Sequence, residues 1–145
     1  MIAMEDVVAV LNVGLAGGTI KDVEGIGAIP AAFDQVKASP TAFVLPPIMA
    51  ALPNDAGTGL VRQKVDVRVQ VLLVFTGIGA DAGADLSPDI TAAIAGIIDT
   101  LTGKVLADMN DPLVLVSAGG AEVDQDAGTL LYPFTFGTGY TLRKN

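Results

Sequence analysis

The sequence predicts an α+β fold in which an antiparallel sheet of about four strands packs against two to three helices. Residues 61–75, VRQKVDVRVQVLLVF, alternate between apolar and polar side chains, which indicates a long, half-buried strand. Residues 87–101, SPDITAAIAGIIDTL, repeat isoleucine and leucine at helical spacing. With 145 residues and no boundary between two cores in its composition, the chain is expected to form a single domain over residues 1–145.

The first part of the chain predicts a helix and then a short strand. Glu5 and Asp6 favour a helix start, and Gly17-Gly18 favours its end. Between them lies a broad apolar face of Val7, Val8, Val10, Leu11 and Leu15. Pro30 could open a short helix that ends before Pro40. Residues 41–47, TAFVLPP, predict a strand that two prolines close.

A loop and the long strand are expected next. Residues 53–59, PNDAGTG, are typical of turns. In the strand at 61–75 the odd positions hold Val61, Val65, Val67, Val69, Val71 and Leu73. The even positions hold Arg62, Lys64, Asp66, Arg68 and Gln70, here called the charged stripe. The two sets therefore lie on opposite faces of the strand.

The second half of the chain predicts a helix and a hairpin. Ser87, Pro88 and Asp89 are suited to a helix start, and Gly103 to its end. The expected buried face is Ile90, Ile94, Ile97, Ile98 and Leu101. Two strands at 113–122 and 129–142 are separated by DQDAG and are expected to pair. The predicted order is therefore helix, strand, strand, helix, strand, strand.

Composition favours an assembly component. Hydrophobic residues make up 51% of the chain and charged residues 17%, against about 25% in an ordinary soluble domain. A surface that is short of charge indicates contact with other molecules. The longest uncharged run, residues 38–54, contains four prolines, so a membrane helix is not expected there. No secretory signal is expected at the N-terminus.

Most enzyme chemistry is not expected. The chain has no Cys or His, which removes thiolate chemistry and the most common near-neutral general base. Ser39, Ser87 and Ser117 stand at no recognised spacing from any lysine. The formal charge of −8 does not favour attraction to DNA phosphates. We therefore expect no enzyme activity, no catalytic residues and no cofactor.

Two motifs suggest ligands, and a simpler interpretation is preferred for each. Residues 77–82, GIGADA, match the dinucleotide-binding pattern G-x-G-x-x-A, but the following helix is expected to begin only at Ser87. Carboxylates gather in two places, at Asp81, Asp85 and Asp89 and at Glu122, Asp124 and Asp126. Either group could offer oxygens to Ca²⁺, but solvated turn residues explain both. No metal site is predicted.

The charged stripe has two interpretations. It could be the solvated face of an antiparallel sheet. Alternatively, it could meet neighbouring copies, whose acidic loops would complement it. Under the second interpretation, the expected interface residues are Arg62, Lys64, Asp66, Arg68, Gln70 and Tyr140.

The layout of these segments resembles the tail terminator proteins of long-tailed bacteriophages. An amphipathic N-terminal helix, TAFVLPP, the strand at 61–75, the helix at 87–101 and the closing LLYPFTFGTGYTL follow in the family's order. The matching landmarks are Pro46, Phe75, Phe136 and Tyr140. The sequence departs from the pattern after the helix, where Gly103-Lys104-Val105 replaces a bulky aromatic residue.

The resemblance implies a structural virion protein, assembled in the host cytoplasm. Such a protein forms a ring, commonly of six copies, that caps the tail tube and joins the tail to the head or neck. The implied partners are further copies, the tail tube protein and a head completion or neck protein, with a sheath protein as a further candidate. DNA would pass through the ring without specific binding. The alternatives are a head completion or neck connector, a tail tube subunit, or a small ligand-binding domain or enzyme.

Overall fold

The computed structural model describes residues 4–15, 18, 20–26, 40–57, 59–76, 87–120, 122–124 and 128–144. In chain order, its helices and strands are α1 (Met4–Leu15), β1 (Asp22–Gly25), β2 (Thr41–Val44), β3 (Ile48–Ala51), β4 (Val61–Phe75), α4 (Ser87–Leu101), β5 (Val114–Ala118), β6 (Glu122–Asp124) and β7 (Thr129–Lys144). Neither described helix has the length and apolarity of a membrane-spanning segment.

The centre of the sheet is the long antiparallel pair of β4 and β7. All fifteen residues of β4 have partners in β7, from Val61 opposite Lys144 to Phe75 opposite Leu130. The strand order is β1-β2-β4-β7-β5, with β3 also paired to β4 and β6 to β7. Pairing is antiparallel throughout except between β1 and β2, which are parallel.

The prediction of an α+β fold is confirmed, but the prediction of about four strands is wrong. The described residues form seven strands. Two of the missed strands, β1 and β3, have only four residues each, and every residue of β3 is exposed, so neither shows a clear alternation of apolar and polar residues. The expected strand at 113–122 divides into β5 and β6, because Gly119 and Gly120 adopt positive φ angles of 119° and 71° between them.

The long strand and the hairpin agree with expectation. β4 spans the predicted residues 61–75, and β6 pairs with β7 in the antiparallel sense expected of the hairpin. The odd positions from Val65 to Leu73 are buried, and burying each valine contributes about 1.5–3 kcal/mol. The last five residues of β4 are buried on both faces, because Leu72 and Val74 join a second apolar cluster with Phe43.

Both described helices cover the odd-numbered face of β4. Val7 and Leu11 of α1 and Ala93, Ile97 and Leu101 of α4 are fully buried in the same cluster as the β4 valines. α4 ends as predicted, and Gly103 has a φ of 86° just after it. The short helix proposed to start at Pro30 lies outside the described residues.

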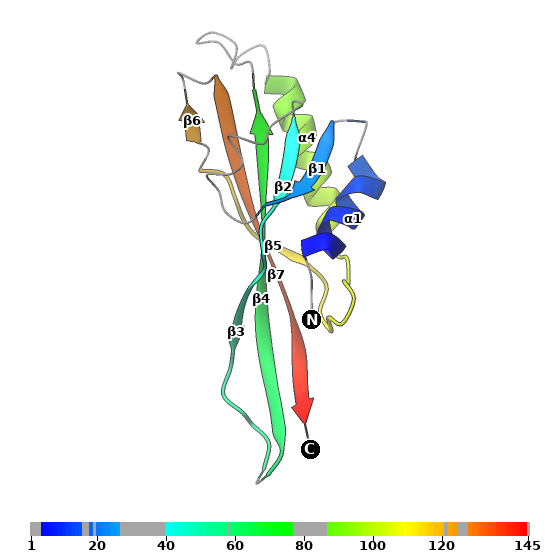
Figure 1. Cartoon of the computed structure of the whole chain (residues 1–145), viewed down its shortest axis with the longest axis vertical. Coiled ribbons are helices and arrows are strands. Elements are labelled where there is room, and N and C mark those ends of the chain that lie inside the picture. Colours follow the sequence, from blue (N-terminus) through cyan, green and yellow to red (C-terminus); the bar gives the residue numbers. More distant parts are fainter. Residues whose placement is uncertain are drawn as a thin grey trace.

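One end of the sheet extends beyond the helices as an arm (Figure 1). We define the arm as residues 48–68 and 137–144, which include β3, the first half of β4 and the second half of β7. The rest of the chain is called the body. Figure 1 shows α1 and α4 beside the upper part of the sheet, and the C-terminus near the tip of the arm. The arm therefore carries most of the charged stripe away from the helices.

Candidate assembly interface

The charged stripe lies on one face of β4, opposite the buried valines. Arg62, Lys64 and Arg68 are exposed, whereas Asp66 and Gln70 are half-buried. Residues directly opposite in antiparallel strands share a face. The cross-strand partners of the stripe in β7 are Arg143, Thr141, Gly139, Gly137 and Thr135, in the order of the stripe.

Two glycines of β7 make room for the charged side chains. The guanidinium of Arg68 lies over Gly137, in space that a Cβ atom at this position would fill. At Gly139, a Cβ atom would come within 2.9 Å of the Val65 carbonyl oxygen and 3.1 Å of the Asp111 carboxylate. The sequence FGTG therefore lets long side chains lie across the sheet at the base of the arm.

Two surface ion pairs involve the stripe. The Arg62 Nε lies 2.9 Å from Asp55 Oδ1, and the Lys64 Nζ lies 3.6 Å from Asp111 Oδ2. Each of these four side chains is about half exposed, so each pair contributes only about 0–1 kcal/mol. The fold does not depend on these pairs, and their charges are accessible to a partner.

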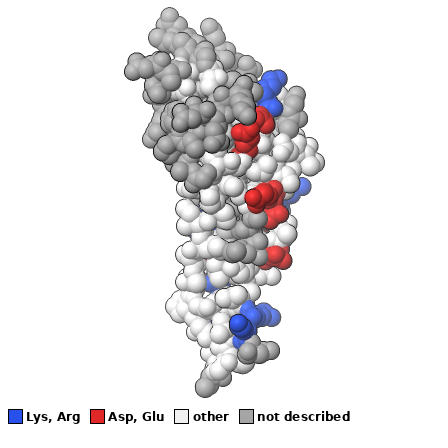
Figure 2. All heavy atoms as spheres, in the orientation of Figure 1, with Lys and Arg blue, Asp and Glu red and all other residues white. Residues whose placement is uncertain are grey.

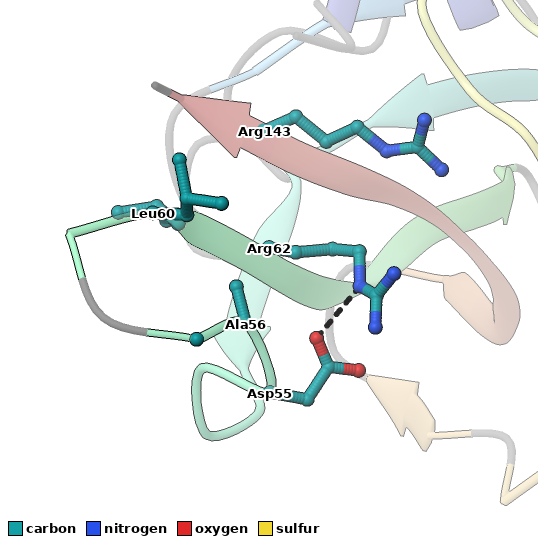
Figure 3. A pocket seen from close by; sticks show the side chains of 7 residues that line it. Asp55, Ala56, Leu60, Arg62 and Arg143 are labelled. Atoms are coloured by element: carbon teal, nitrogen blue, oxygen red, sulfur yellow. Dashed lines mark hydrogen bonds and ion pairs between the residues drawn. The ribbon is translucent and has the colours of Figure 1, made fainter.

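A shallow cleft of about 360 Å³ lies at the tip of the arm (Figure 3). Arg62 and Arg143 enter it from neighbouring strands, and Asp55 approaches from the connecting loop. Its other lining residues are Ala56, Gly57, Leu60 and Val61. Arg143 has no carboxylate partner among the described residues, and it stands directly opposite another arginine. Because like charges directly opposite each other repel, a carboxylate of another molecule would bind favourably between these two arginines.

The loop beside this cleft is fixed by Asn54. Its Oδ1 accepts a hydrogen bond from the Arg62 backbone N–H at 2.8 Å, and its Nδ2 donates to the Leu60 carbonyl at 2.9 Å. The described residues of the predicted loop at 53–59 lie between β3 and β4, outside both strands, as expected. The Asn54 side chain holds the turn together with a backbone hydrogen bond from the Asp55 N–H to the Arg62 carbonyl at 3.1 Å.

Tyr140 does not lie with the stripe. It stands opposite Val65, and its side chain therefore emerges on the face of the buried valines. Its hydroxyl donates to the Met49 sulfur at 3.9 Å. Of the six residues predicted for the interface, the structure brings the five of the stripe onto one face and leaves Tyr140 on the other.

The sequence analysis missed Arg143 and Lys144. It ended the last strand at Leu142, whereas β7 continues to Lys144 and places Arg143 opposite Arg62. The alternation of Thr141 and Arg143 with Leu142 was the available signal for a longer strand. The signal was weak because the residues lie at the end of the chain.

The structure gives no support to the nucleotide, metal and serine sites considered from the sequence, as far as its described residues reach. The GIGADA segment at 77–82 lies outside the described residues, as do Asp81, Asp85 and Asp126. Among the residues that the structure does describe, no group of three or more acidic residues is placed to hold a metal ion. Ser87 begins α4, and Ser117 lies in the exposed strand β5.

Comparisons with known proteins agree with the resemblance seen in the sequence. The model of the family described as "Phage tail terminator protein" matches residues 3–145. A search of curated proteins found no match. A chain from the solved structure titled "Virion of native gene transfer agent (GTA) particle" has a similar fold, with a TM-score of 0.57 and 14% sequence identity. That similarity covers 97% of this chain and 92% of the other. The family match gives the chain a structural, tail-related role, and we conclude that it belongs to the phage tail terminator family.

Proposed function

We propose that this protein ends the tail tube of a phage-like particle. In this proposal several copies, commonly six in the family, form a ring that caps the last ring of the tube and joins the tail to the head or neck. The observation that carries the proposal is the family match over residues 3–145. The neighbour in a gene transfer agent particle supports the fold over nearly the whole chain.

The surface of the molecule supports assembly. Ten large hydrophobic side chains of the described residues are exposed: Val13, Ile48, Met49, Leu52, Leu60, Val105, Val114, Leu115, Val116 and Leu142. Three of them lie in β5, a strand that pairs with β7 and is exposed along its whole length. Exposed apolar groups and an accessible strand edge are typical of surfaces that meet other chains.

The proposed partners are further copies, the tail tube protein and a head completion or neck protein. The location is the tail or neck of the virion, after assembly in the host cytoplasm. DNA passes through the ring without specific binding, because the chain carries a net charge of −8 and does not attract phosphates.

The proposed function can be tested with tail tubes that assemble in the absence of any terminator protein. We expect the purified protein, added during growth, to stop elongation and to appear at one tube end in negative-stain images. Unlimited tube length at saturating protein would contradict the proposal. Filaments formed by the protein alone would instead identify a tube subunit.

We also propose that the charged stripe is part of the interface between copies. In Arg62→Glu/Arg68→Glu, like charges would face the acidic surface of a neighbour, so we expect a normal fold and association weakened by about tenfold or more. The matched control is Lys21→Glu/Lys37→Glu, which makes the same change of charge outside the arm and outside α1 and α4. Sedimentation equilibrium measures both, and equal association of the two variants would show the stripe to be only a solvated face.

A further inference from the structure

We propose that the arm of one copy docks onto the helix layer of a second copy, formed by α1 and α4. The inference rests on the proposed assembly and names the two surfaces that meet. It also gives the contact a direction, because the arm and the helix layer are different surfaces. A contact of this head-to-tail kind closes into a ring when the rotation between copies allows it.

Charge divides sharply between the arm and the body. The arm carries five of the eight basic residues of the chain, Arg62, Lys64, Arg68, Arg143 and Lys144, against the two acids Asp55 and Asp66. The body carries three basic and fourteen acidic residues. The formal charges are therefore +3 for the arm and −11 for the body. Figure 2 shows Lys and Arg side chains near the lower end of the molecule, and Asp and Glu side chains above them together with a few further Lys or Arg side chains.

Among the described parts of the body, the helix layer is the surface whose charge best complements that of the arm. α1 and α4 contain the four acids Glu5, Asp6, Asp89 and Asp99 and no basic residue. Asp99 lies in the last turn of α4, where a negative charge opposes the helix dipole, and it has no described ion-pair partner. This unfavourable placement is explained if a basic group from another copy approaches the end of α4.

The apolar groups of the two surfaces also match. Val13 of α1 is 91% exposed, the highest exposure among the large hydrophobic residues described. It lines a hollow of about 320 Å³ between the two helices, together with Ala9, Val10, Gly14, Thr100 and Lys104. The arm offers exposed apolar side chains next to its basic residues, at Ile48, Met49, Leu52, Leu60 and Leu142. Each surface thus combines apolar groups with a charge opposite to that of the other.

DNA fits the arm less well. Affinity for a phosphate backbone comes from basic and polar groups, and exposed aliphatic side chains add nothing to it. Five large apolar side chains on the arm would remain in water on a DNA duplex, whereas a protein surface would bury them. The body would also repel DNA, because its net charge is negative.

Reciprocal charge reversal tests the contact. The arm-reversed variant is Arg68→Glu/Arg143→Glu, chosen because neither arginine has a described ion-pair partner that the change would break. The body-reversed variant is Glu5→Lys/Asp99→Lys, at two exposed positions on α1 and α4. Circular dichroism checks that both fold, and light scattering after size exclusion, with and without tail tubes, measures association.

We expect each variant alone to associate about tenfold or more weakly than the unmodified protein. We expect an equimolar mixture of the two to recover association, because the two introduced glutamates on the arm of one variant then meet the two introduced lysines on the helix layer of the other. Should the lysine substitutions disturb the fold, the neutral variants Arg68→Gln/Arg143→Gln and Glu5→Gln/Asp99→Asn test the weakening alone, with a smaller expected loss, and wild-type association of either variant would then contradict the contact.

Three results would overturn the contact. The variants could associate as well alone as the unmodified protein, or the folded mixture could fail to recover association. A short DNA duplex could also bind the unmodified protein and not the arm-reversed variant in fluorescence anisotropy, which would make the arm a DNA contact. A different result would overturn the proposed function itself: the unmodified protein would form no oligomer, even in the presence of tail tubes.

Discussion

At the scale of single residues, Gly137 and Gly139 shape the charged face. They stand opposite Arg68 and Asp66, and a side chain at either position would occupy space that neighbours already fill. The neighbours differ in kind. Gly137 faces the end of the flexible Arg68 side chain, whereas Gly139 faces the backbone carbonyl of Val65 in the central strand.

This difference predicts unequal effects of two alanine substitutions. Gly139→Ala places a Cβ atom 2.9 Å from the Val65 carbonyl oxygen, so the two central strands must move apart. We expect the free energy of unfolding to fall by about 1–3 kcal/mol. Gly137→Ala should cost less, because Arg68 can swing toward solvent. Urea denaturation followed by circular dichroism compares the two, and a larger loss for Gly137→Ala would contradict the assignment.

At the scale of elements, β4 serves two surfaces at once. Its odd positions from Val65 onward build the core under the helices, and its even positions from Arg62 to Gln70 form the charged stripe on the other face. This division begins at Lys64 and Val65 and ends where Leu72 and Val74 enter the second apolar cluster. The strand is therefore a core element at one end and a solvent-facing element at the other.

The two faces predict opposite tolerance to charge. Val67 is fully buried, so Val67→Lys places an uncompensated charge in the core and should lower the free energy of unfolding by about 3 kcal/mol or more. Gln70→Lys, three residues further along the same strand, adds the same charge on the stripe. This substitution should change the free energy of unfolding by about 0.5 kcal/mol or less. Thermal and urea unfolding measure both. Similar losses for the two variants would mean that the faces are assigned wrongly.

At the scale of the whole molecule, the division of charge between arm and body predicts how salt affects assembly. Raising the ionic strength from about 0.1 M to about 1 M shortens the Debye length from about 10 Å to about 3 Å, which screens exposed charges. We expect association of the unmodified protein to weaken over this range. Sedimentation equilibrium at several salt concentrations measures it.

The arm-reversed variant is the control for this salt series. Its arm and body carry charge of the same sign, so its residual association should be unchanged or should strengthen with salt. If the unmodified protein also associates more tightly at high salt, apolar contact governs assembly and charge does not.

Much of the fold followed from the sequence because its signals are local. The alternation at 61–75 and the spacing of Ile97 and Leu101 depend only on neighbours along the chain, and both gave the right element with the right bounds. The loop residues around Asn54 and the turn glycine Gly103 were equally informative. The resemblance to tail terminator proteins also lay in the order of these segments, and the family match confirms it.

The tertiary structure alone decided which residues from distant segments share a surface. Register placed Arg143 beside Arg62 and put Tyr140 on the core side, because a shift of one residue between β4 and β7 exchanges the faces. β1 and β3 are strands only because β2 and β4 offer them backbone hydrogen bonds. The sequence by itself determined the long strand β4, the helices α1 and α4 and the surplus of acid. Packing determined that the basic residues project on an arm, since only the folded sheet carries β4 and β7 past the helices together.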